Sequence, residues 1–236
     1  MTTNQKKTPG YLEDEHLSIG TKAYLKVLNA GDKPVESLPV MEARNVLVNA
    51  QTSVEVDLSG IEESEKAIIV DDRMILLNIL RPEGKTENLP VFIFIHGGGW
   101  VLGDYPTHKR LARDLVVESG YACVFINYTP SPEARFPQAI DEIYAATCWV
   151  VEHGNEIHVN GKQLGIVGNS VGGNMAFVTS MLAKEQKGPD IKIQILMWPV
   201  TDAHFDWESY ELYGQQRFLT TSLMKWMFDQ YLNAED

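Results

Sequence analysis

The chain has 236 residues and a mass of 26.5 kDa, which is enough for one substantial domain with its own hydrophobic core. Its net charge of −12 makes nucleic acids and anionic membrane surfaces poor default partners. Because the sequence has no signal-peptide core, no uncharged apolar run of about 18 residues and only two cysteines, we expect a cytoplasmic protein with no membrane span.

Two short helices are predicted near the N-terminus. Apolar residues recur at mixed helical spacing over residues 13–29, and a second helix is predicted over 40–48, with Pro39 near its start. The acidic stretch 51–66 has a weak pattern and is predicted to be a loop. Residues 1–50 are therefore interpreted as an N-terminal helical segment, separate from the core.

From about Lys66 the pattern changes to strands. Two strands joined by a turn at Asp71-Asp72 are predicted first, and strands then alternate with helices. The predicted strands are 67–70, 74–80, 91–95, 121–127, 164–168 and 191–198, and the predicted helices are 108–118, 137–153 and 171–187. This alternation predicts an α/β fold over residues 51–200, with a mostly parallel central sheet flanked by helices.

The last segment, residues 201–236, is predicted to be helical over 209–232 and is rich in aromatic side chains. These side chains fit two interpretations equally well: an ordinary core, or the wall of a hydrophobic acyl pocket beneath a cap.

A candidate nucleophile lies between the third buried strand and its helix. Gly168-Asn169-Ser170-Val171-Gly172 fits the pattern G-x-S-x-G, and a strand leads into it and a helix out of it, as a nucleophile elbow requires. Such a turn holds the serine in a strained backbone conformation that projects its hydroxyl above the sheet edge. Ser170 is therefore the predicted nucleophile, and the alternative is a serine that merely caps a helix.

A glycine-rich segment, His96-Gly97-Gly98-Gly99-Trp100, follows the strand at 91–95. Successive glycines leave backbone N–H groups open, and attack on an ester creates an oxyanion that such donors stabilise, each donor contributing about 3–4 kcal/mol. We predict that the N–H groups of Gly97, Gly98 and Val171 form an oxyanion hole. A phosphate loop is disfavoured because no Gly-Lys-Ser/Thr is present, which leaves a flexible loop or an anion nest as the alternative.

The two motifs resemble those of the hormone-sensitive-lipase-like branch of the α/β-hydrolases, the bacterial carboxylesterases with an HGGG loop. The resemblance covers roughly residues 72–236; besides the two motifs, it is carried by segments 104–108, 128–137 and 198–202. The family usually has Asp where this chain has Asn169, and the stretch 128–133 is altered. Both departures affect the subfamily and substrate more than the chemistry.

This resemblance implies an α/β-hydrolase core with a helical cap, made from the N-terminal helices and from the segment after Pro199. It implies cleavage of short-chain acyl or acetyl esters through an acyl-enzyme intermediate, with no cofactor and no metal. It also implies that His96 orients the oxyanion loop and is not the base, that Asn169 has a supporting role, and that His108 supports the site at most.

A serine nucleophile needs a base, and the base needs an orienting carboxylate. In this fold the chain order is serine, acid, histidine, yet His204 is the only histidine after Ser170. A single loop would have to supply both Asp202 and His204, which is an unfavourable geometry. We expect instead that the chain is an N-terminal portion, that its sheet exposes an apolar edge, and that these residues alone give weak or no turnover.

Three functions compete on this evidence. A carboxylesterase acting on a small-molecule ester is favoured by the elbow and the glycine loop. An amidase or formamidase would use the same oxyanion geometry, and a non-catalytic protein that binds small ligands would explain the missing histidine. The sequence leaves open whether the protein forms a homo-oligomer or joins a second chain that supplies the C-terminal part.

Overall fold

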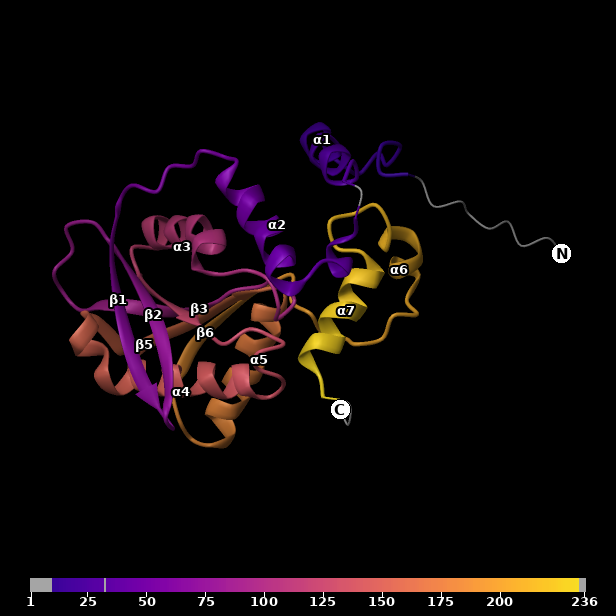
Figure 1. Cartoon of the computed structure of the whole chain (residues 1–236). Helices are drawn as coiled ribbons and strands as arrows, with labels where there is room; N and C mark the ends of the chain where they lie inside the picture. Colours follow the sequence, from indigo (N-terminus) through magenta and orange to yellow (C-terminus); the bar gives the residue numbers. More distant parts are fainter. Residues whose placement is uncertain (1–9, 32, 234–236) are drawn as a thin grey trace.

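One mixed sheet of six strands forms the centre of the computed structural model, which describes residues 10–31 and 33–233 (Figure 1). Across the sheet the strands are β1 (Ile61–Val70), β2 (Arg73–Pro82), β4 (Ala122–Asn127), β3 (Leu89–Ile95), β5 (Val159–Asn169) and β6 (Ile191–Met197). β4, β3, β5 and β6 are parallel, whereas β2 pairs antiparallel with both β1 and β4. The predicted α/β fold with a mostly parallel sheet is therefore confirmed.

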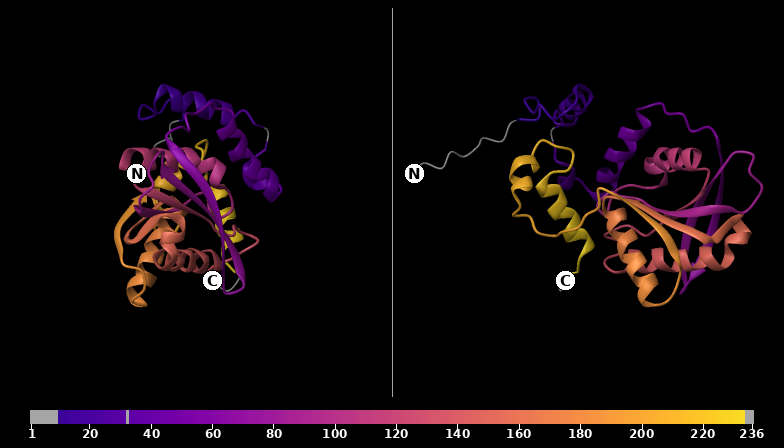
Figure 2. Two further views of the ribbon diagram at one scale, coloured as in Figure 1. Left: turned by 90° about the vertical axis from the view of Figure 1, so that its left-hand side faces the viewer. Right: turned by 180° about the vertical axis from the view of Figure 1, so that it is seen from behind.

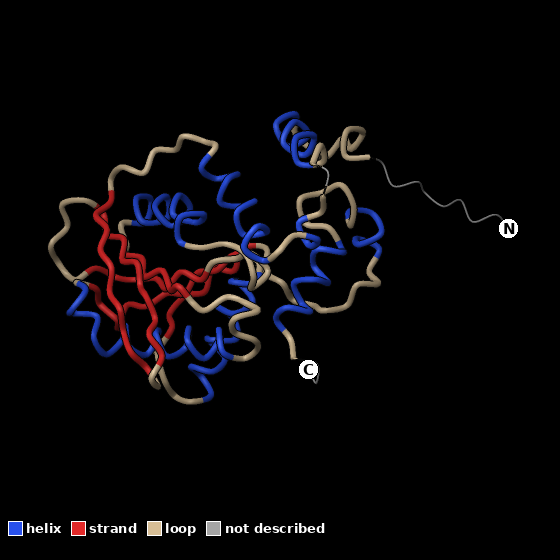
Figure 3. The backbone as a smooth tube through the Cα atoms, viewed as in Figure 1, coloured by secondary structure: helices blue, strands red, loops and turns tan. Residues whose placement is uncertain are grey.

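Helices cover both faces of this sheet (Figures 1 and 3). Phe92 and Phe94 of β3 pack with α3 (Tyr105–Ser119) on one face. Val91, Ile93 and Ile95 pack with α4 (Gln138–His153) and α5 (Val171–Glu185) on the other. Because both faces of β3 are buried, its sequence is an almost unbroken apolar run.

The prediction of a loop over 51–66 was wrong for residues 51–52, which end a helix, and for residues 61–66. Residues 61–66 belong to β1, and Ile61 and Lys66 pair with Pro82 and Leu77 of β2. β1 is an edge strand, and most side chains of its first half are exposed. Charged residues are common on edge strands because they discourage pairing with other chains, so the acidic composition concealed the strand.

The remaining helices are α1 (Ile19–Leu28), α2 (Val40–Thr52), α6 (Glu208–Tyr213) and α7 (Thr221–Tyr231), with short 3-10 helices η1 (Val35–Ser37) and η2 (Gly154–Ile157). α6 and α7 lie beyond the ends of the strands, next to α1 and α2 (Figures 1 and 2). The single helix predicted over 209–232 is in fact two, since α6 ends at Tyr213 with Gly214 as its C-cap, and Thr220 caps α7 by accepting from the Leu223 N–H. Residues 1–9 of the predicted N-terminal segment lie outside the described residues.

A buried ion pair ties the N-terminal segment to the segment before α7. Arg217 Nη2 lies 2.9 Å from Asp14 Oδ2, and their side chains are 13% and 5% exposed. Asn29 Nδ2 also donates to the carbonyl of Gln216 at 3.2 Å. Segments nearly 200 residues apart in the sequence therefore pack as one layer beside the sheet.

β6 forms the second edge of the sheet. Ile193 and Ile195 on this strand are 54% and 41% exposed, so the apolar edge expected from the sequence is present. Among the helices of the described residues, none combines the length and the apolar character needed to span a membrane.

Candidate active site

Ser170 lies on the turn between β5 and α5, with φ 55° and ψ −124°. A positive φ at a non-glycine residue costs about 1–3 kcal/mol and persists only where the surroundings impose it. Here the Ser170 N–H donates to Met197 O at 2.9 Å, and the Ser170 carbonyl accepts from the N–H groups of Gly173 and Val200 at 3.0 and 3.2 Å. The ends of β6 and α5 thus hold the serine in this conformation.

Two glycines make this turn sterically possible. A Cβ on Gly168 would overlap the carbonyl oxygen of Gly172. A Cβ on Gly172 would overlap the carbonyl oxygen of Ile95 and lie 2.7 Å from that of His96. Neither position therefore has room for a side chain, and the elbow packs directly against the start of the glycine-rich loop.

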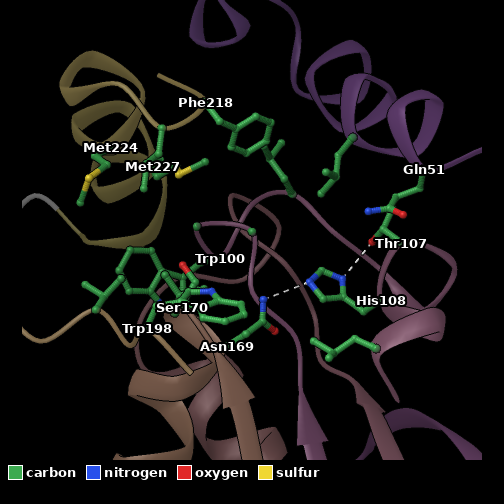
Figure 4. Close-up of a pocket in the computed structure, with 18 of the residues that line it drawn as sticks. Gln51, Trp100, Thr107, His108, Asn169, Ser170, Trp198, Phe218, Met224 and Met227 are labelled. Atoms are coloured by element: carbon green, nitrogen blue, oxygen red, sulfur yellow. Dashed lines mark hydrogen bonds between the residues drawn. The ribbon is translucent and has the colours of Figure 1, made fainter. Parts of the chain in front are cut away.

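Ser170 opens onto a cavity of about 500 Å³ between the end of the sheet and helices α2, α3 and α7 (Figure 4). Large apolar side chains form most of its wall: Trp100, Trp198, Phe218, Met224, Met227 and Phe228. Gln51, His108 and Arg110 supply polar groups. The aromatic-rich C-terminal segment therefore fits both interpretations of its sequence: Phe218 and Phe228 line the pocket, whereas Tyr231 and Trp226 pack in hydrophobic clusters.

The glycine loop faces this cavity through Gly98 and Gly99, and Val171 lines it beside Ser170. The prediction that Gly97 contributes an oxyanion donor needs correction. Its N–H donates to Asn169 Oδ1 at 3.0 Å, and Gly97 is not part of the cavity wall. Gly99 was not among the predicted donors, but it lines the cavity where Gly97 does not.

His96 is buried beneath the loop. Its Nδ1 lies 2.7 Å from the Gly97 carbonyl, and its ring stacks on those of Tyr128 and Phe125, with centroids 4.3 and 5.6 Å away. Burial, with a smaller contribution from nearby His108, lowers the pKa of His96 to about 3. A neutral imidazole then donates from Nδ1 to the Gly97 carbonyl, which fits the supporting role that the resemblance implied.

Asn169 links the glycine loop to His108. Its Oδ1 accepts from the Gly97 N–H, and its Nδ2 lies 3.4 Å from His108 Nε2 (Figure 4). Burial lowers the pKa of His108, and a neutral ring can accept at Nε2 while Nδ1 faces Thr107 Oγ1 at 3.0 Å. The amide of Asn169 can donate to this neutral ring, whereas an ionised carboxylate at this position could not.

Asp202 and His204 form a pair away from Ser170. His204 Nδ1 lies 2.6 Å from Asp202 Oδ1, and Trp207 Nε1 donates to the other carboxylate oxygen at 2.8 Å. Both residues lie outside the wall of the cavity, and the side chain of His204 is largely exposed. The one histidine among the described residues that line the cavity is His108. Its Nε2 lies near the side-chain amide of Asn169.

The low pKa of His96 predicts that the protein loses stability in mild acid. The unfolded chain binds a proton near pH 6.5 and the folded chain only near pH 3, so the unfolded state gains protons first as the pH falls. Between pH 6.5 and 4.5 the free energy of unfolding should fall by about 2–3 kcal/mol from His96, and His108 adds to the loss in the same direction. Urea unfolding at the two pH values measures this.

The control for this prediction is His204→Gln. The hydrogen bond to Asp202 raises the pKa of His204, so His204 acts in the opposite direction and its removal should leave the acid loss in place. Equal stability at pH 6.5 and 4.5 would contradict the prediction.

Comparison with known proteins identifies related chains. A family model described as alpha/beta hydrolase fold matches residues 92–236. An alpha/beta hydrolase of Acanthamoeba polyphaga mimivirus is 34% identical over 199 residues, covering 84% of this chain and 57% of its own length. An ethyl acetate hydrolase of Pseudomonas putida is 27% identical over 219 residues, covering 89% of this chain and 69% of its own.

Among solved structures, a thermostable esterase from Pseudomonas putida ECU1011 is 51% identical, with a TM-score of 0.91. The match covers 94% of this chain and 70% of that one. An esterase from the fungus Rhizomucor miehei is 33% identical, with a TM-score of 0.83 and coverage of 90% and 68%. The chain spans about half the length of many curated relatives, with shares of 57%, 46%, 69% and 43% for four of them.

Proposed function

Because the chain belongs to the alpha/beta hydrolase family, we propose that the protein is a serine carboxylesterase with Ser170 as its nucleophile. The observation that carries this proposal is the juxtaposition of a strained serine on an elbow with Gly98, Gly99 and Val171 around one cavity. Relatives named esterase and ethyl acetate hydrolase support an ester as the substrate.

In the proposed reaction, Ser170 Oγ attacks the carbonyl carbon of the ester. The carbonyl oxygen becomes an oxyanion and accepts hydrogen bonds from the N–H groups of Gly98, Gly99 and Val171, which Gly97 cannot join because its N–H is already engaged. A general base takes the proton from Ser170 Oγ during the attack and returns it to the alcohol, which leaves as the intermediate collapses to an acyl-enzyme. Water then attacks the carbonyl carbon of the acyl-enzyme and forms a second oxyanion at the same site. Collapse of that intermediate releases the carboxylic acid and restores the Ser170 hydroxyl.

The cavity wall supports small, mostly apolar substrates. Its surface is dominated by aromatic and methionine side chains, and Arg110 is the charged side chain among the described residues that line it. Such a wall favours an apolar acyl or alcohol group and excludes water from the reacting carbonyl. We propose that residues 1–50 and 201–236 form a cap over the core 51–200. We also propose that the protein acts in the cytoplasm.

The test uses the protein expressed from its natural gene, with p-nitrophenyl acetate, p-nitrophenyl butyrate and the matching p-nitroanilides as substrates. We expect ester turnover to exceed amide turnover, and a fluorophosphonate probe to modify the peptide that contains Ser170. Purified residues 1–236 alone should show weak or no turnover. Comparable rates on esters and amides would favour an amidase, and binding of small ligands without labelling would favour a non-catalytic protein.

A further inference from the structure

The turn that carries the oxyanion glycines holds Trp100 in a strained conformation. Gly98, Gly99 and Trp100 have φ values of 116°, 64° and 63°; glycine adopts positive values at little cost, whereas tryptophan does not. Within the turn, the Gly98 carbonyl accepts from the N–H groups of Val101 and Leu102 at 3.2 and 2.8 Å. A strained turn of this kind keeps its shape only where its surroundings impose it.

Arg44 of α2 supplies such a restraint from outside the core. Its Nε donates to the Val101 carbonyl at 2.8 Å, and its Nη2 donates to the Ser131 carbonyl at 3.0 Å. The Ser131 N–H in turn donates to the Trp100 carbonyl at 2.8 Å. Arg44, the turn and the loop at 130–133 are thus joined in one closed set of hydrogen bonds.

A carboxylate orients the guanidinium for this task. Nη1 and Nη2 of Arg44 lie 2.8 and 2.6 Å from the two oxygens of Glu133. Hydrogen bonding to Arg44 is the largest cause that lowers the pKa of Glu133, so the pair is fully charged at neutral pH. The Arg44 side chain is only 17% exposed, and a fixed planar fork can bind two carbonyls and a carboxylate together, which a lysine ammonium cannot.

We propose that Arg44 is a positioning residue for the oxyanion turn, acting through the carbonyls of Val101 and Ser131. The proposal rests on the esterase function proposed above. Arg44 is not part of the cavity wall and touches no substrate. Through it, the docking of α2 determines whether the N–H groups of Gly98 and Gly99 point at the reacting carbonyl.

The test compares Arg44→Lys with Arg113→Lys in the protein expressed from its natural gene. Arg113 is a matched control: it is 16% exposed, donates from Nε to the Ser59 carbonyl at 2.7 Å, pairs with Asp57 at 3.3 Å, and lies outside the cavity wall. Arg44→Lys should lower kcat on p-nitrophenyl acetate about tenfold with KM within about twofold, because a misplaced donor weakens the transition state more than substrate binding. Arg113→Lys should leave both constants within about twofold of the wild type.

Amide hydrogen exchange gives a readout that does not need turnover. The amides of Val101 and Leu102 should exchange about tenfold faster in Arg44→Lys and at the wild-type rate in Arg113→Lys. If the protein has no esterase activity, the proposed function fails, while exchange still decides the role of Arg44. Equal exchange of these amides in both variants and the wild type would overturn the inference, as would equal kcat in an active enzyme.

A second variant covers the case in which Arg44→Lys does not fold. Glu133→Gln keeps the two backbone carbonyls as partners of Arg44 but removes the charge that orients it. We expect a smaller increase in the exchange of the same two amides, of about twofold to threefold. Unchanged exchange in this variant would also overturn the inference.

Discussion

In the protein expressed from its natural gene, replacing Ser170 with alanine is expected to abolish fluorophosphonate labelling and to lower kcat on p-nitrophenyl esters on the order of 10⁴-fold or more. The reason is chemical: alanine offers no oxygen to form the acyl-enzyme, while the oxyanion glycines and the cavity remain in place. Labelling mapped by mass spectrometry and initial rates on the acetate ester measure both effects.

Ser170→Gly separates the chemistry from the backbone strain. Glycine also lacks the nucleophile, so activity should be lost as in Ser170→Ala. Glycine adopts φ 55° and ψ −124° without the strain of about 1–3 kcal/mol that serine or alanine bears there. Its greater conformational freedom in the unfolded chain offsets about 0.5–1 kcal/mol of this stabilisation. Urea unfolding should therefore show Ser170→Gly to be about 1 kcal/mol more stable than Ser170→Ala.

Two results would contradict this account of Ser170. Retained labelling in Ser170→Ala would mean that another nucleophile reacts. A Ser170→Gly variant less stable than Ser170→Ala would mean that the turn is not strained at this residue.

The core of the fold could be predicted because its signals are local. Apolar runs such as 91–95 mark strands buried on both faces, and Gly168 records a steric collision with Gly172, four residues away. These features depend on neighbours in the sequence, so periodicity and composition reveal them. The edge strand at 61–66 escaped because exposed edges carry no apolar pattern.

The details of the site could not be predicted because distant residues decide them. Three successive glycines look equivalent in the sequence. The Gly97 N–H is engaged because it donates to Asn169, 72 positions away. The contact between Arg44 and Glu133 spans 89 positions and leaves no periodic trace. Such pairings become visible only when the fold has brought their elements together.

Gly172→Ala is expected to destabilise the protein by about 3–5 kcal/mol, which is in the exceptional range for a single substitution. Gly172 is the second residue of α5, where alanine would by itself favour the helix by about 1 kcal/mol. Its Cβ would overlap the carbonyl oxygen of Ile95 and approach that of His96 at 2.7 Å. These are backbone atoms at the end of β3, which cannot move aside without shifting the glycine loop, so the collision outweighs the helical preference.

Gly20→Ala is the matched control, because Gly20 is likewise the second residue of a helix, α1, whose N-cap is Ser18. There the nearest atom to the added Cβ is Ser18 Oγ at 3.9 Å, so the substitution should stabilise the protein by about 0.5–1 kcal/mol. In a chain of this size, thermal unfolding should show a midpoint lowered by roughly 6–20 °C for Gly172→Ala and raised by about 1–4 °C for Gly20→Ala. A Gly172→Ala protein within about 0.5 kcal/mol of the wild type would show that the elbow and the glycine loop are not in contact. The position of the oxyanion donors relative to Ser170 would then depend on the hydrogen bond from the Gly97 N–H to Asn169 Oδ1 and not on this close packing.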